Sequence, residues 1–146
     1  MRTYTWERQK THLWRLSGMI AVALCMGTVS LSRAQEDKVI ARGRTEYQQS
    51  CAICHGEQGK GNGSMAELLR TTRPTDLTQI RKTHAGQFPF WRVYRVIDGR
   101  EEIKGHGTRD MPIWGQTFRL VEGGNEDAVR GRIWQLLYYL QTLQEE

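Results

Sequence analysis

The sequence predicts an all-α protein with about four short helices joined by long loops. The clearest observation is the segment Glu126–Leu143, where apolar residues recur with the period of an α-helix. A second observation is that few segments alternate between apolar and polar residues, as a half-buried strand would. A third is that glycine and proline recur between the helical segments, where they mark turns. Together these observations predict helices and no sheet.

The first three helices are predicted from residues that commonly begin or end a helix. Val39–Cys51 forms the first of them, and Ser64 can cap a short second one. Phe88–Ile97 forms the third, because Pro89 suits the start of a helix and an Asp-Gly pair ends it. Most of the glycines lie outside the predicted helices.

The last helix contains a glycine that indicates a close contact. Asn125 can cap this helix, and two acidic residues follow in its first turn. Gly131 lies in its interior, where glycine costs about 1 kcal/mol relative to alanine. We therefore expect another backbone to approach Gly131, and we expect its partner to be Gly43 of the first helix.

Residues 1–34 have the pattern of a secretory signal peptide. A basic segment precedes Gly18–Leu31, which carries no charge, and small residues at Ser32 and Ala34 suit cleavage before Gln35. Fourteen uncharged residues are also fewer than the about 20 that a membrane-spanning helix needs. We predict that residues 35–146 are exported to the periplasm as one domain. The alternative is an uncleaved leader, which would attach the chain to the membrane.

The net charge of +5 belongs mainly to this leader. Without it the chain has 16 basic and 15 acidic residues, a net charge of +1. The charge therefore does not argue for nucleic-acid binding. What remains is an uneven distribution, with seven basic and three acidic residues in 81–109 and three basic and six acidic residues in 110–146. This basic segment predicts attraction to an acidic redox partner.

The two cysteines of the mature chain lie in the sequence Cys51-Ala52-Ile53-Cys54-His55. Half of a zinc site would need a second pair of ligands, and a redox disulfide would leave His55 without a role. Covalent attachment of a c-type haem explains all three residues, because both thiols add to the haem vinyl groups and the imidazole binds the iron. We therefore predict one haem c, with Cys51 and Cys54 attached to it and His55 as the proximal ligand.

The second axial ligand is predicted by elimination. Met111 lies in a glycine-rich loop, and Pro112 keeps it out of a helix. Such a residue can reach across a flat cofactor. Met65 is better interpreted as a side chain that fills the core, whereas His106 is an alternative ligand because it shares the loop with Met111. A thioether ligand raises the reduction potential and leaves no open position at the iron, which favours electron transfer.

With these residues the chain resembles the class I cytochrome c family, in particular its bacterial periplasmic monohaem members. The resemblance rests on the Cys51–His55 motif and on Met111-Pro112, with Gly43 and Tyr47 on the first helix as weaker support. It implies a cytochrome c fold, in which crossed terminal helices and long loops surround one covalently attached haem. It also implies that a proline carbonyl accepts the proximal imidazole N–H, for which Pro74 is the candidate.

The predicted function is that of a periplasmic electron carrier whose haem cycles between Fe(III) and Fe(II). No arrangement of catalytic residues is visible, so we predict no enzymatic activity. The expected partners are redox proteins that donate and accept the electron. The alternatives are the haem c subunit of a periplasmic dehydrogenase complex and a haem peroxidase or gas sensor.

Overall fold

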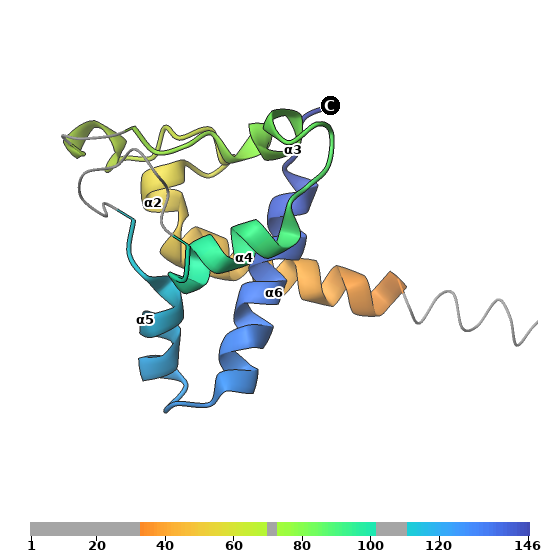
Figure 1. Cartoon of the computed structure of the whole chain (residues 1–146), viewed down its shortest axis with the longest axis vertical. Coiled ribbons are helices and arrows are strands. Elements are labelled where there is room, and N and C mark those ends of the chain that lie inside the picture. The colour runs from red at the N-terminus through yellow and green to blue at the C-terminus, as the bar shows by residue number, and fades with distance from the viewer. Residues whose placement is uncertain (1–32, 70–72, 102–110) are drawn as a thin grey trace, which may run out of the picture. The chain divides into compact units, whose positions relative to one another are not determined.

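The computed structural model describes residues 33–69, 73–101 and 111–146, and every regular element within them is helical (Figure 1). The chain divides into two compact units, Met1–Lys38 and Val39–Glu146. Of the first unit only residues 33–38 are described, so nearly all of the predicted signal peptide lies outside the described residues. No helix in the described ranges is long and apolar enough to cross a membrane.

The second unit begins within a helix over residues 33–50, which confirms the first predicted helix. The elements that follow are α2 (Ala52–His55), η1 (Ala66–Leu68), η2 (Leu77–Gln79), α3 (Ile80–Thr83), α4 (Phe90–Asp98), α5 (Trp114–Val121) and α6 (Glu126–Thr142). Asn125 caps α6 as predicted, because its side chain accepts hydrogen bonds from the amides of Asp127 and Ala128. Ser64 does not cap a helix, and η1 after it is a single 3₁₀ turn.

Helix α6 forms the centre of the core. The helical period of its sequence places one apolar face inside, where Val129, Ile133, Leu136, Leu137 and Leu140 are buried. Helices α4 and α5 both pack on α6 and on each other, as Figure 1 shows. Burial of each large apolar side chain contributes about 1.5–3 kcal/mol, so this face holds the helices together.

The helix of residues 33–50 crosses α6 at a glycine. A Cβ on Gly43 would overlap the backbone carbonyl of Gln135, so only glycine allows this approach. Next to the crossing, Arg132 Nη2 lies 2.7 Å from Glu46 Oε2. The expectation for Gly131 was wrong, because a Cβ there would meet no atom within 4 Å. The close contact of α6 is with Gly43, but it involves Gln135, one turn further along the helix.

Gly43→Ala should destabilise the protein by about 3 kcal/mol, because the added methyl group forces the two helices apart. The matched control is Gly131→Ala, which adds the same group in open space and should stabilise α6 by about 1 kcal/mol. Urea unfolding of the two holoproteins measures both changes. Equal stabilities would contradict the observed crossing.

Candidate functional site

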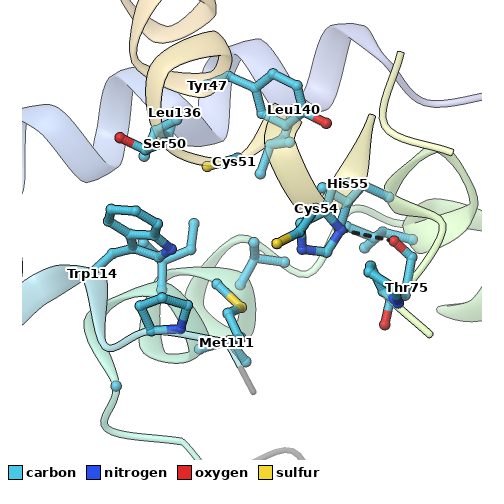
Figure 2. A pocket seen from close by; sticks show the side chains of 18 of the residues that line it. Tyr47, Ser50, Cys51, Cys54, His55, Thr75, Met111, Trp114, Leu136 and Leu140 are labelled. Carbon is cyan, nitrogen blue, oxygen red and sulfur yellow. Dashed lines mark hydrogen bonds between the residues drawn. The ribbon is translucent and has the colours of Figure 1, made fainter. Parts of the chain in front are cut away.

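The described part of the second unit contains a cavity of about 700 Å³ (Figure 2). Its walls are mainly apolar and come from the end of the first helix, α2, α4, the start of α5 and α6. Leu136 and Leu140 of α6 form one wall, and Val93, Val96 and Ile97 of α4 form another. A cavity of this size and lining suits a large, flat apolar cofactor.

The cysteine motif lies on the one-turn helix α2, directly after the first helix. The amide of His55 donates to the carbonyl of Cys51 at 2.9 Å, and this turn places Cys51 and His55 on one face. Cys54 also lines the cavity, and both thiols are free. The three predicted residues of the motif therefore face the same space, as Figure 2 shows.

His55 is held by a backbone carbonyl. Its Nδ1 lies 3.0 Å from the carbonyl oxygen of Thr75, to which the ring donates when Nδ1 carries the proton. Burial lowers the pKa of His55, although the bond to Thr75 acts in the opposite direction. The imidazole is therefore kept neutral, which is the form that binds a metal.

The assignment of this carbonyl to Pro74 was wrong by one residue. Pro74 lines the cavity, but its carbonyl faces Gly61, where a Cβ would overlap it. Successive carbonyls of a non-helical segment point in different directions, so only one of the pair can face His55. That one belongs to Thr75.

Tyr47 holds the backbone at Gly56, the residue directly after His55. Its ring is fully buried, and its hydroxyl donates a 2.6 Å hydrogen bond to the carbonyl of Gly56. The sequence places Tyr47 on one face of the first helix with Gly43, but it does not reveal this bond. Burial raises the pKa of Tyr47, because the buried phenolate would lose its contact with water, and the nearby Cys51 and Tyr139 add to this effect.

Tyr47→Phe should cost about 1–2 kcal/mol, because the buried carbonyl of Gly56 loses its donor. A phenol whose pKa is higher in the folded state stabilises the fold below its unfolded pKa of about 10, and this contribution disappears as the pH rises above that value. Unfolding free energies measured between pH 7 and 11 should therefore converge for the two proteins at high pH. A difference that stays constant up to pH 11 would show that the Tyr47 hydroxyl ionises equally well in the folded and unfolded states, contrary to its burial.

Met111 faces the cysteine motif across the cavity (Figure 2). It is half-buried and non-helical, as Pro112 predicts, and α5 begins three residues later at Trp114. The structure therefore brings Cys51, Cys54, His55 and Met111 around one space. His106, the alternative ligand, lies outside the described residues.

Charged side chains that the sequence did not single out also line the cavity. Arg92 Nη1 lies 3.0 Å from His84 Nε2, and Arg92 Nε lies 3.3 Å from Glu101 Oε1. Arg73 is a second cation in this lining. The excess of basic residues in 81–109 was a signal for Arg92, whereas nothing in the sequence pointed to Arg73. These cations could meet the carboxylates of a bound cofactor.

An all-helical fold with two cysteines, a histidine and a methionine around one apolar cavity is that of a c-type cytochrome. A family model described as cytochrome c oxidase, cbb3-type, subunit III matches residues 38–129, which is more than half of the chain. The chain belongs to this family. It therefore carries covalently bound haem c with its iron and transfers electrons through it. No curated protein and no solved structure matches the chain.

Proposed function

We propose that the protein is a periplasmic one-electron carrier in which His55 and Met111 are the two axial ligands of the haem iron. The observation that carries this proposal is that both side chains line the same apolar cavity and point into it (Figure 2). Because Nδ1 of His55 is engaged by Thr75, Nε2 is the nitrogen left for the iron. Cys51 and Cys54 lie beside His55 and would hold the haem through two thioether bonds.

The residues around the cavity suit electron transfer. The bound haem supplies a centre that accepts and releases one electron. The carbonyl of Thr75 orients the His55 ring and makes it a stronger donor, while the apolar walls exclude water. Arg73 and Arg92 offer positive charge to the haem propionates. If His55 and Met111 both bind the iron, no position would remain for oxygen or peroxide, which would argue against a peroxidase or gas sensor.

An optical spectrum of the matured protein tests the ligation. A c-type spectrum of the reduced form, together with the weak red band of sulfur-ligated ferric haem, is the expected result. A high-spin ferric spectrum would overturn the proposal and favour an enzyme or sensor with an open site. The same protein should be found in a periplasmic extract with its mature chain beginning at Gln35.

A second candidate is a permanent electron-transfer subunit of a larger enzyme. The description of the family as an oxidase subunit favours this possibility, and a periplasmic dehydrogenase would use such a subunit in the same way. The chemistry at the haem is the same in both cases. Size-exclusion chromatography after extraction under native conditions separates them, because a carrier elutes alone and a subunit elutes in a stable complex.

We further propose that the redox partners are acidic proteins that dock near the basic segment. Arg92 and Arg95 of this segment lie on α4, and Arg92 lines the cavity. Opposite charges accelerate association, and salt screens them over about 8–10 Å. The rate of electron transfer with the native partner should therefore fall as the ionic strength rises. A rate that does not depend on salt would contradict this docking.

A further inference from the structure

The last residue of α4 is a buried carboxylate that the proposed electron transfer does not use. The side chain of Asp98 has no exposed surface. Its Oδ1 accepts a 2.9 Å hydrogen bond from Nη2 of Arg119 on α5, and its Oδ2 pairs with Arg100. A buried charge is costly unless it is paired, so Asp98 depends on these two arginines.

Asp98 also contacts the beginning of α5. A Cβ on Gly115 would overlap both the carboxylate and the backbone carbonyl of Asp98, so the first turn of α5 lies directly against this residue. A negative charge at the start of a helix is favoured by the helix dipole. Next to it, the side chain of Ile113 occupies the space that a Cβ on Gly99 would need. The end of α4 therefore holds the segment that begins two residues after Met111.

Ion pairs extend this contact to α6. Arg119 Nε lies 2.7 Å from Glu126 Oε1 at the start of α6. At the other end of α5, Glu122 Oε1 lies 3.0 Å from Arg132 Nη1. Ion pairs thus join α5 to α4 and to α6. Asp98 is the fully buried member of this network.

We infer that Asp98 is a positioning residue for the distal ligand: by holding Gly115 and Arg119 at the start and in the body of α5, it keeps Met111 at the cavity. This inference rests on the proposed ligation of the iron by Met111. Asp98 itself lies outside the cavity lining. When the pair with Arg119 is lost, the start of α5 is released, and the protein spends more time with Met111 away from the iron. An added ligand then competes more easily for that position.

The test is the binding of imidazole to the oxidised holoprotein of Asp98→Asn. The amide keeps the shape of the side chain but removes its charge. We expect imidazole to bind about tenfold more tightly than in the wild type, with a weaker sulfur–iron band before imidazole is added. The matched control is Glu46→Gln, which breaks another partly buried pair with an arginine, Arg132, in the crossing of the first helix with α6. It should lower stability without changing imidazole affinity.

Arg119→Gln provides a second variant: it removes the partner of Asp98 on α5, together with the pair between Arg119 and Glu126, and it leaves Asp98 with Arg100. If Asp98→Asn does not accumulate as a holoprotein, Arg119→Gln decides the question. Imidazole affinity equal to that of Glu46→Gln in either variant would overturn the role of Asp98. A wild-type protein without a sulfur–iron band would instead overturn the proposed ligation by Met111, so the two failures are distinguishable.

Discussion

Met111→Ala should lower the reduction potential of the haem by on the order of 100 mV and open the iron to small ligands. A thioether binds ferrous iron better than ferric iron, so its loss favours the oxidised state. For one electron about 59 mV corresponds to a tenfold change in the equilibrium constant, so the expected shift is about fiftyfold. A spectroelectrochemical titration measures the reduction potential. Carbon monoxide binding to the reduced protein measures how accessible the iron is to small ligands.

The matched control for this experiment is His106→Ala. His106 belongs to the same glycine-rich segment, and its replacement should change neither the potential nor the binding of carbon monoxide. If the two variants exchange their behaviour, His106 is the distal ligand and the assignment of Met111 is wrong. This control is informative because the sequence left both residues as candidates.

Cys51→Ser combined with Cys54→Ser should abolish the folded state. Without covalent haem, α4, α5, α6 and the cysteine motif would surround an apolar cavity of about 700 Å³. Without haem the apolar walls of this cavity would face water instead of the macrocycle, and the lost burial is a large part of the roughly 5–15 kcal/mol by which domains are stable. We expect circular dichroism of the double variant to show a largely unfolded chain.

Cys25→Ala is the control for the double variant. Cys25 lies in the predicted leader, so this substitution should leave the mature holoprotein unchanged. A haem-free protein that keeps its full helix content and unfolds cooperatively would show that the polypeptide alone forms the core. The haem would then bind in a preformed cavity, and the core would not need it in order to form.

Local sequence patterns predicted the parts of the fold that local forces determine. Helix α6 follows from its apolar period and from Asn125, whose side chain caps it. The haem-attachment motif is one turn of helix, so its spacing alone places Cys51 and His55 on one side. Pro112 excludes a helix at Met111, and the chain there is non-helical.

Helix α5 was not predicted, because contacts distant in sequence hold it. It has only eight residues, contains Gly115 and exposes Leu120 and Val121, so its sequence is too short and too irregular for a helical period to be recognised. Its stability comes from partners such as Asp98 on α4, which no local pattern reveals. The same limit explains the error at Gly131, since a glycine within a helix does not identify which position another backbone approaches.

The hydrogen-bond partner of His55 shows a finer limit. The resemblance to class I cytochromes c implied a proline carbonyl, for which Pro74 was the candidate, but the direction of each carbonyl depends on backbone angles that the sequence does not specify. Thr75 makes the contact, while the carbonyl of Pro74 packs on Gly61. An error of one residue along an extended segment reverses which side of the chain each group faces.

The crossing of the first helix over α6 has a consequence for the order of events during folding. Glu46 and Arg132, which pair beside Gly43, are 86 residues apart, so their meeting closes a long loop at an entropic cost. The cysteine motif, in contrast, is a turn whose backbone hydrogen bonds join residues that are close in sequence. We expect haem attachment to be possible before the two ends meet. The attached haem would then be the apolar surface on which the late crossing assembles.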